Sequence, residues 1–222
     1  MAISKDKKQQ LVADLNELLS DAKMTVFAKY QGLTVAEMQE LRKAAFLDRD
    51  GVINVDHAYV HRWEEFEWVE GVLEAARRLS EAGYLLVIVT NQSGIGRGYY
   101  TEEDFERLNR EVRRAFEEAG APLAGIYFCP HHPVKALEPY RKECGCRKPA
   151  PGMLLEAARD LNINLSQSLM VGDKVSDMQA AQAAGVPVRI LVGTDGKAEP
   201  AFEAPATQTA KNLFEAVRAL LP

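Results

Sequence analysis

The sequence predicts an α/β fold, in which a doubly wound parallel sheet carries helices on both faces. Two observations indicate this class. From Gly51 onward, short apolar runs alternate with amphipathic stretches of helical period, and residues 84–90 form one continuous apolar run. Such a run is typical of a strand buried on both faces, and strand–helix alternation implies a parallel sheet. The 222 residues, 47% hydrophobic and 27% charged, suit one or two globular domains.

Five strands are expected from the apolar runs. The first begins at Ala44 and ends at Asp48, where two acids and a glycine follow one another closely. The other four are residues 84–90, 124–128, 168–172 and 188–192. Because parallel sheets bind ligands outside the carboxyl ends of their strands, the residues that follow these runs are the candidates for chemistry.

The helices between the strands show apolar stripes. In residues 102–119, with Thr101 as N-cap and Gly120 as C-terminal stop, the stripe consists of Phe105, Leu108, Val112 and Phe116. A second stripe, ended by Gly83, consists of Val72, Leu73, Ala76 and Leu79. The remaining crossovers are supplied by helices after Pro151-Gly152 and near Met178.

The first 44 residues are predicted to be a short added α-β-α segment. Residues 11–19 mark an amphipathic helix, residues 24–28 a short strand, and Thr34 with Glu37 a capping box that opens a second helix. The segment is too small to hold a large core alone, so it must dock on the main domain, pair with another chain or remain partly disordered. We therefore divide the chain into residues 1–44 and 45–222.

Charge and composition argue against several classes of protein. The net charge of −5 lacks the basic excess that is usual in general nucleic-acid binding. No apolar run approaches the roughly 20 residues that span a membrane, and the N-terminus lacks the continuous apolar region of a secretory signal. We expect a cytoplasmic monomer that acts on a small molecule, with no membrane, nucleic-acid or ribosome partner.

Asp48 and Asp50 are the most informative pair in the chain. Their spacing directs both side chains the same way if the strand geometry persists. Asp48 is the candidate nucleophile, because a carboxylate can form an aspartyl phosphate and divide hydrolysis into two easier steps. Asp50 is then the general acid for the leaving alcohol and the base that activates water. Taken alone, Asp50-Gly51 fits a turn equally well.

Polar residues after the other strands also fit phosphoryl transfer. Residues 90–93 offer hydroxyl, amide and backbone donors, and Arg147 with Lys148 adds positive charge after the third strand's long loop. Asp173, after the fourth strand, can complete a magnesium site of hard oxygen ligands. Taken alone, residues 90–93 can be a polar loop, and Arg147 with Lys148 a solvated charged pair. Asp173 can be a helix cap, although Asp177 fits that role better than Asp173 does. Their order, each behind an apolar strand, favours the chemical interpretation.

All three cysteines lie in one short stretch beside two histidines. Cys129-Pro130-His131-His132 and Cys144-Gly145-Cys146 offer nitrogen and sulfur ligands in two close groups, which is the pattern of a closed structural zinc site. In a cytosolic chain such clustering favours metal over a disulfide. Either histidine can complete the tetrahedron of Cys129, Cys144 and Cys146, and three buried free cysteines are the alternative. The zinc would pin the loop that leads to Arg147 and Lys148.

Residues 54–61 follow the nucleophile strand as a flap that is too short to be a cap domain. We therefore expect a site that is open enough for a small substrate. His57 and His61 can equally be surface histidines without a role. The aromatic residues that follow are expected to pack the flap, and these are Trp63, Phe66 and Trp68.

With these residues the chain from about 45 to 222 resembles the haloacid dehalogenase-like phosphatases. The resemblance rests on the four strand-end motifs, the zinc loop and the Asp-His-Ala-Tyr flap. It implies that Asp48 is the nucleophile, that Asp50 is the proton donor, and that Mg²⁺ is held by the carboxylates of Asp48 and Asp173 and the main-chain carbonyl of Asp50. It selects His131 over His132. The substrate-binding residues that it implies are Asp56, His57, Ala58, Tyr59, Thr90, Asn91, Gln92, Ser93, Arg147, Lys148 and Lys174.

Two branches of this family differ in substrate. One removes the C7 phosphate of a heptose 1,7-bisphosphate of either anomer, in ADP- or GDP-heptose precursor synthesis for lipopolysaccharide or S-layers. The other, the histidinol-phosphate phosphatases, typically carries a glutamate and prolines where this chain has residues 54–57, and lacks the Pro-x-Pro-Gly-Met run of residues 149–153. Both differences favour the heptose branch, with histidinol phosphate or another small sugar phosphate as the alternative.

Residues 1–44 resemble an unrelated protein, the bacterial ribosomal stalk-base protein, through residues 28–35 and 40–43. The likeness ends near Lys43, before the rest of that protein's RNA-binding domain, so ribosome binding is not implied. The segment is an addition to the phosphatase: a natural fusion, an engineered chimera or a gene-assembly artefact. A ribosome-associated binding module is the competing class of function, and the intact acids and the net negative charge argue against it.

Overall fold

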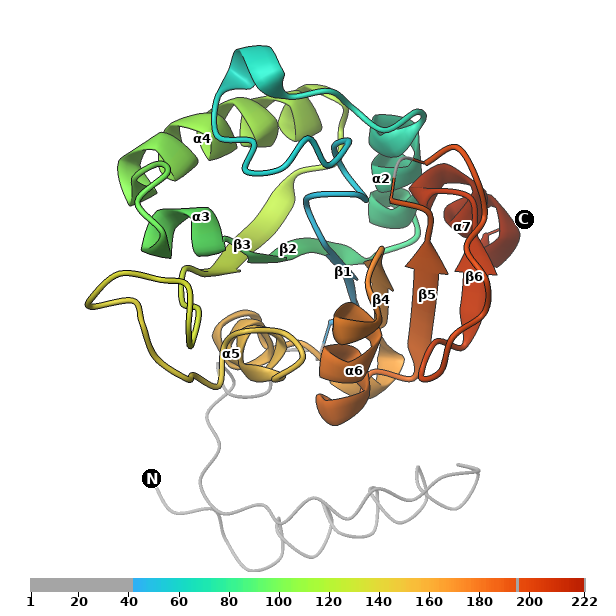
Figure 1. Cartoon of the computed structure of the whole chain (residues 1–222). Coiled ribbons are helices and arrows are strands. Elements are labelled where there is room, and N and C mark those ends of the chain that lie inside the picture. Colours follow the sequence, from blue (N-terminus) through green and yellow to red (C-terminus); the bar gives the residue numbers. More distant parts are fainter. Residues whose placement is uncertain (1–41, 195, 222) are drawn as a thin grey trace, which may run out of the picture. The chain divides into compact units, whose positions relative to one another are not determined.

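The protein's structure, a computed structural model, describes residues 42–194 and 196–221. Six parallel strands form one sheet in the order β3-β2-β1-β4-β5-β6 (Figure 1). The strands are β1 (Ala44–Leu47), β2 (Leu85–Asn91), β3 (Leu123–Cys129), β4 (Leu169–Gly172), β5 (Val188–Val192) and β6 (Gln208–Ala210). Residues 1–41 of the predicted α-β-α segment lie outside the described residues.

Six α-helices connect and cover the strands, and among the described residues none is long and apolar enough to cross a membrane. Two short 3₁₀ helices, Trp63–Glu65 and Leu165–Gln167, add to them. The α-helices are α2 (Val72–Glu81), α3 (Ser93–Gly96), α4 (Glu102–Glu118), α5 (Gly152–Leu161), α6 (Val175–Ala183) and α7 (Leu213–Leu220).

The sheet separates two apolar cores, and the strands β1, β2, β4 and β5 supply residues to both. In β1, Ala45 and Leu47 join the core formed with α2, α4 and α7, whereas Ala44 and Phe46 join the core formed with α5 and α6. Figure 1 shows these two groups of helices on opposite sides of the sheet. This two-residue alternation explains why the sequences of β1 and β4 are apolar throughout, since both faces of the sheet are covered there. The predicted doubly wound parallel sheet is therefore confirmed.

The order of the strands places a topological switch point at β1. From β1 the chain adds β2 and β3 on one side, and it then returns to add β4, β5 and β6 on the other. The crossovers therefore diverge at the carboxyl ends of β1 and β4, which leaves a crevice there. Asp48 follows β1 directly and Asp173 follows β4 directly, so both acids enter this crevice.

The five predicted strands agree with the structure to within two residues, but the prediction of five was incomplete for the described part of the chain. The sixth strand, β6, has the sequence Gln-Thr-Ala, and its polar side chains give no strand-like apolar run. The short helices α3 and α7 were also not predicted. In α4 the expected N-cap is present, because the Thr101 hydroxyl accepts the Asp104 N–H and the Asp104 carboxylate accepts the Thr101 N–H.

Candidate active site

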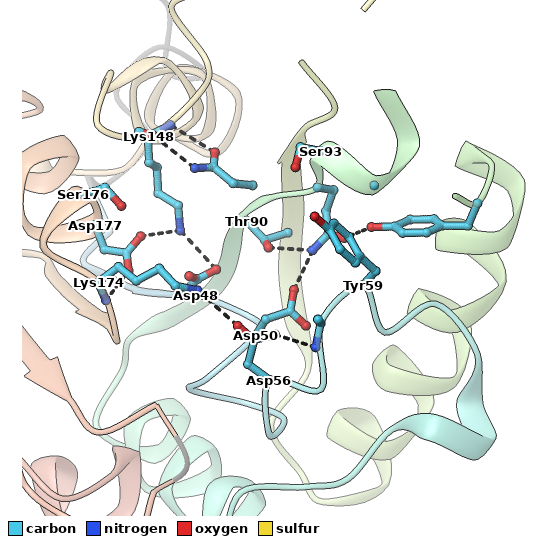
Figure 2. Close-up of a pocket in the computed structure, with 15 residues that line it drawn as sticks. Asp48, Asp50, Asp56, Tyr59, Thr90, Ser93, Lys148, Lys174, Ser176 and Asp177 are labelled. Carbon is cyan, nitrogen blue, oxygen red and sulfur yellow. Dashed lines mark hydrogen bonds and ion pairs between the residues drawn. The ribbon is translucent and has the colours of Figure 1, made fainter. Parts of the chain in front are cut away.

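A cavity of about 250 Å³ opens at the carboxyl ends of the central strands (Figure 2). It is bordered by eleven residues that the sequence nominated, which are Asp48, Asp50, Asp56, Ala58, Tyr59, Thr90, Asn91, Gln92, Ser93, Lys148 and Lys174. Four further residues border it, and these are Gly94, Tyr100, Ser176 and Asp177. Segments far apart in the sequence therefore meet here because the parallel sheet aligns the ends of its strands.

Asp48 is buried beside a buried ammonium group. Lys148 Nζ lies 3.1 Å from Asp48 Oδ1 and 2.7 Å from Asp177 Oδ1, and it also donates to the carbonyl oxygen of Val89 at 2.8 Å. Burial raises the pKa of Asp48 to about 7 although Lys148 opposes the shift, and the neighbouring acids add to it. For Lys148 the two carboxylates outweigh burial, so the pKa of the ammonium lies above its usual value. The ammonium therefore stays charged against the candidate nucleophile.

Asp50 lies in a different environment, where donors surround its carboxylate. The fully buried guanidinium of Arg49 donates to both oxygens at 2.9 and 3.0 Å, and the side-chain amides of Asn54 and Gln92 donate at 3.1 and 2.9 Å. Burial acts to raise the pKa of Asp50, but Arg49 and these hydrogen bonds outweigh it, so the pKa lies below its usual value. The two acids, two positions apart, are thus held in contrasting states, which is how one site can separate the roles of two carboxylates.

Asp173 provides the clearest indication of a cation. Its side chain is fully buried, yet neither carboxylate oxygen has a hydrogen-bond partner among the described residues, and Lys174 Nζ is 3.5 Å away. One carboxylate oxygen from each of Asp48, Asp173 and Asp177 lies within 4.8 Å of the other two. A buried carboxylate without donors is costly unless a cation compensates it, and clustered carboxylate oxygens are the ligands that Mg²⁺ prefers. These residues therefore fit a magnesium ion.

Gly51 allows Asp173 to approach the end of β1. A Cβ atom at Gly51 would lie 2.4 Å from Asp173 Oδ2, and the backbone there has a φ of +90°. Both observations require glycine, because a larger residue would clash with the Asp173 carboxylate and because residues with a Cβ rarely adopt this φ. The Asp-Gly pair therefore does mark a turn, and that turn brings the acids of β1 and β4 together.

Asn91 joins the end of β2 to Lys148. Its side-chain oxygen accepts the Lys148 N–H, and its Nδ2 donates to the Lys148 carbonyl oxygen, both at 3.1 Å. This paired contact fixes the backbone that carries the buried ammonium. Asn91 therefore has a structural task at the site, and Thr90 and Ser93 place their hydroxyl groups around the same cavity (Figure 2).

The flap closes one side of the cavity through an ion pair. Lys174 Nζ lies 3.3 Å from Asp56 Oδ2, which links the flap to the segment after β4. Ala58 and Tyr59 follow with φ values of 60° and 59°, a left-handed conformation that is strained for residues with side chains. The Tyr59 ring packs edge-on against Tyr99 with their centroids 4.7 Å apart.

Two of the residues nominated for substrate binding, His57 and Arg147, do not border this cavity. His57 is half exposed and its Nε2 lies 2.7 Å from Glu67 Oε2, beside a separate surface groove. Arg147 donates from Nη1 to the carbonyl oxygen of His131 at 3.1 Å, so its guanidinium is directed to the cysteine-containing loop. Substrate contact by these two residues stays a prediction.

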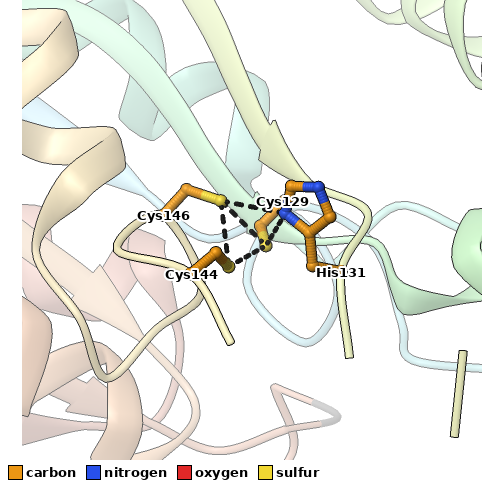
Figure 3. A group of neighbouring side chains, drawn as sticks. All are labelled: Cys129, His131, Cys144 and Cys146. Atoms are coloured by element: carbon orange, nitrogen blue, oxygen red, sulfur yellow. Dashed lines mark hydrogen bonds between the residues drawn. The ribbon is translucent and has the colours of Figure 1, made fainter. Parts of the chain in front are cut away.

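The cysteine-containing loop gathers its ligands at one point (Figure 3). Cys146 Sγ lies 3.2 Å from the Sγ atoms of both Cys129 and Cys144, and His131 Nδ1 lies 3.4 Å from Cys146 Sγ. In a tetrahedral site with bonds of about 2.3 Å, ligand atoms lie under about 4 Å apart, so the spacing fits a metal. His132 is engaged elsewhere, because its Nδ1 accepts the N–H groups of Val134 and Lys135.

Comparison with known proteins agrees with this geometry. The family model of HAD-hydrolase-like proteins matches residues 145–219. The D-glycero-beta-D-manno-heptose-1,7-bisphosphate 7-phosphatase of Yersinia pestis is 48% identical over 177 residues, which cover 80% of this chain and 94% of that protein. The chain belongs to this phosphatase family.

Other members and one solved structure extend the likeness. The heptose-bisphosphate phosphatase of Vibrio cholerae is 52% identical over 166 residues, which cover 75% of this chain and 89% of that protein. The crystal structure of the D,D-heptose 1,7-bisphosphate phosphatase of B. bronchiseptica, complexed with magnesium and phosphate, is 33% identical with a TM-score of 0.68. The match covers 81% of this chain and 98% of the B. bronchiseptica chain.

The N-terminal part of the chain matches a second family. The model of ribosomal protein L10 matches residues 3–52, so the match continues past the expected limit near Lys43 and overlaps β1 of the heptose-bisphosphate phosphatase part. The overlap includes Asp48 and Asp50. The division between an added segment and a phosphatase domain at residue 44 stays a prediction.

Several residues that shape the site were not recognised from the sequence. Arg49 stands between two acids in a polar turn, which is typical of a solvated residue, and Asn54 was treated only as part of the flap. Tyr100 lies eight positions beyond Gln92, outside any recognised motif. The signal for Asp177 was present, because the sequence placed it at a helix start, and its Oδ2 does accept the Lys174 N–H at 3.0 Å.

Proposed function

We propose that this protein hydrolyses the C7 phosphate of D-glycero-D-manno-heptose 1,7-bisphosphate through an aspartyl phosphate on Asp48, in the synthesis of heptose precursors for lipopolysaccharide. The observation that carries the proposal is the contrast between two acids. Asp48 lies beside Lys148 and near Asp173, whose oxygens accept no hydrogen bond from the described residues, whereas Asp50 is held among hydrogen-bond donors. The identity to the heptose-bisphosphate phosphatases supports the substrate.

The reaction has two steps, and Asp50 acts as the general acid in the first and as the general base in the second. A carboxylate oxygen of Asp48 attacks phosphorus, the bond from phosphorus to the sugar oxygen breaks, and Asp50 protonates that oxygen as heptose 1-phosphate leaves. A water molecule then attacks the phosphorus of the aspartyl phosphate and gives a proton to Asp50. The Asp48 carboxylate is restored and inorganic phosphate is released, so the enzyme returns to its starting state.

The low pKa of Asp50 bears on the first step, because a general acid must carry a proton. In the free protein, Arg49 and the two amides favour the charged carboxylate of Asp50. A bound phosphate brings negative charge close to it, which raises the pKa of a neighbouring acid, and phosphate monoesters themselves bind a proton near about pH 6. We therefore infer that Asp50 acquires its proton when the substrate binds.

Asp48 and Asp173 would hold Mg²⁺, with the main-chain carbonyl of Asp50 as a further ligand. The ion would supply positive charge that lets an anionic nucleophile and an anionic phosphoryl group approach each other. Lys148 supplies a second positive charge 3.1 Å from Asp48 Oδ1, and donors of Thr90, Asn91 and Ser93 would orient phosphate oxygens. The flap residues Asp56, His57, Ala58 and Tyr59, with Arg147 and Lys174, would contact the sugar.

The substrate is tested by measuring magnesium-dependent phosphate release from both anomers of heptose 1,7-bisphosphate and from histidinol phosphate. Because the curated relatives are named for the β anomer, we expect the highest kcat/KM with that anomer and no turnover in excess chelator. Higher kcat/KM with histidinol phosphate would leave the nucleophile in place and would overturn the proposed substrate.

The second metal is proposed to be a structural zinc ion held by Cys129, His131, Cys144 and Cys146. Three thiolates and one imidazole fill a tetrahedron, so no position remains for a substrate. We expect about one zinc ion per chain by elemental analysis after purification without added metal. Metal-free protein of equal stability would refute the assignment.

Variants of the two histidines separate the ligand from its neighbour. His131→Ala is expected to lose zinc and to lower the melting temperature, because the remaining three thiolates are left without their fourth ligand. The matched change His132→Ala removes an acceptor for two backbone N–H groups but should retain the metal. Zinc retained by His131→Ala and lost by His132→Ala would reverse the assignment.

A further inference from the structure

Gln92 connects the candidate general acid to a tyrosine from outside the recognised motifs. Gln92 Nε2 donates to Asp50 Oδ2 and to Thr90 Oγ1, both at 2.9 Å, while the Tyr100 hydroxyl donates to Gln92 Oε1. Gln92 is 2% exposed and Tyr100 is 6% exposed. The contact between Tyr100 and Gln92 is therefore buried, where hydrogen bonds strongly influence orientation.

The chemistry of the neighbours determines which end of the Gln92 amide faces Asp50. An ionised carboxylate only accepts hydrogen bonds, so it requires the NH₂ end of the amide. A guanidinium only donates, and Arg49 Nη2 lies 3.4 Å from Gln92 Oε1, at the long limit for a hydrogen bond. The Tyr100 hydroxyl is therefore the principal donor that holds the oxygen end away from Asp50.

Tyr100 is itself held in place by its neighbours. The His61 ring stacks on it with the centroids 4.9 Å apart and an interplanar angle of 3°. A Cβ atom at Gly94 would lie 2.2 Å from Tyr100 Cε1, so this position admits the tyrosine ring because it is glycine. Burial raises the pKa of Tyr100, so its hydroxyl keeps the proton that it donates.

We propose that Tyr100 is a positioning residue for proton transfer: it fixes the Gln92 amide, and Gln92 in turn holds the Asp50 carboxyl group against the leaving oxygen. This inference rests on the proposed function and adds a residue to the same site. Without the Tyr100 hydroxyl, the oxygen end of the Gln92 amide loses its principal donor and keeps only the long contact with Arg49. The amide is then held less firmly, and so is the Asp50 carboxyl group to which its Nε2 donates.

The test compares substrates that differ in their need for a proton. Loss of an alkoxide from heptose 1,7-bisphosphate needs the general acid, whereas 4-nitrophenyl phosphate releases a stable anion without one. The value of kcat/KM reports only the formation of the aspartyl phosphate, so the later role of Asp50 as a base does not interfere. We expect Tyr100→Phe to lower kcat/KM about 10-fold for the heptose bisphosphate and less than about 2-fold for 4-nitrophenyl phosphate.

Tyr99→Phe is the matched control, because it removes a hydroxyl from an exposed neighbouring tyrosine that has no hydrogen bond to Gln92 in the described part of the chain. It should leave both values near those of the unaltered protein. An equal loss for both substrates in Tyr100→Phe, or no loss for either, would overturn the positioning role. If the unaltered protein hydrolyses 4-nitrophenyl phosphate but not the heptose bisphosphate, the proposed function fails, and the same comparison with any alkyl phosphate that it does hydrolyse still decides the role of Tyr100.

Discussion

Asp48→Asn is expected to lower kcat for heptose 1,7-bisphosphate by about 10⁴-fold or more, because an amide oxygen does not form the covalent intermediate. The fold should be preserved, since Asn has nearly the same shape and the substitution removes a carboxyl group that burial and neighbouring acids already push toward the neutral form. Activity is measured by phosphate release, and the fold by circular dichroism and thermal melting.

The control for this variant is Asp160→Asn, which makes the same chemical change at an exposed acid that pairs with Arg159 on the surface. We expect full activity and an almost unchanged melting temperature, because exposed ion pairs contribute little to stability. Appreciable turnover by Asp48→Asn, verified by mass spectrometry to exclude deamidation back to Asp, would contradict the assignment of the nucleophile.

Lys148→Met is expected to affect both stability and activity. The Lys148 ammonium is buried between Asp48 and Asp177, and its removal leaves two carboxylates without their shared cation. Breaking such a buried pair costs about 3–5 kcal/mol of the free energy of unfolding, and loss of a charge that stabilises the transition state should lower kcat/KM by about 10²–10³-fold. Urea unfolding in buffer without added Mg²⁺ measures the first effect without a compensating metal ion at the carboxylates.

Lys135→Met is the matched control for this variant, because the Lys135 side chain is exposed on the cysteine-containing loop. It should change the free energy of unfolding by less than about 0.5 kcal/mol. A Lys148→Met protein that matches this control in both stability and kcat/KM would show that the buried ammonium has neither of the roles that its contacts indicate.

The parts of the site that follow strands were predictable from the sequence. Asp48, Thr90 and Asp173 each come directly after, or at the end of, an apolar run, and parallel pairing brings such ends together whatever the lengths of the crossovers between them. The same argument predicted the long loop that returns Lys148 to the cavity. The argument uses only the rule that the carboxyl ends of parallel strands lie at the same edge of a sheet. Errors of a single residue in the strand boundaries therefore did not change its result.

The residues that orient the acids were not predictable in the same way. Arg49 is fully buried although it lies between two charged residues, and its position becomes clear only when the carboxylate of Asp50 and the carbonyl oxygen of Val60 are seen around it. Tyr100 reaches Gln92 because a turn after α3 folds back over Gly94. Such contacts depend on loop conformation, for which the sequence carries no periodic signal.

The sequence also did not predict in which direction the charged side chains of the site point. Arg147 and Lys148 are adjacent and were nominated together, yet Lys148 enters the cavity while Arg147 bonds to the carbonyl oxygen of His131. His57 and Asp56 are also adjacent, and they likewise separate, with Asp56 pairing with Lys174 and His57 with Glu67. Motif positions therefore predicted which segments form the site, but contacts were needed to establish which side chains face it.

The position of the phosphate that is removed tests the central claim most directly. ³¹P NMR of the reaction with D-glycero-β-D-manno-heptose 1,7-bisphosphate and Mg²⁺ follows the sugar-bound phosphates and inorganic phosphate separately. We predict loss of the C7 signal and growth of the inorganic phosphate signal, with the C1 phosphate retained at completion and no reaction in Asp48→Asn. Release of the C1 phosphate, release of both phosphates, or an unchanged spectrum would contradict the account.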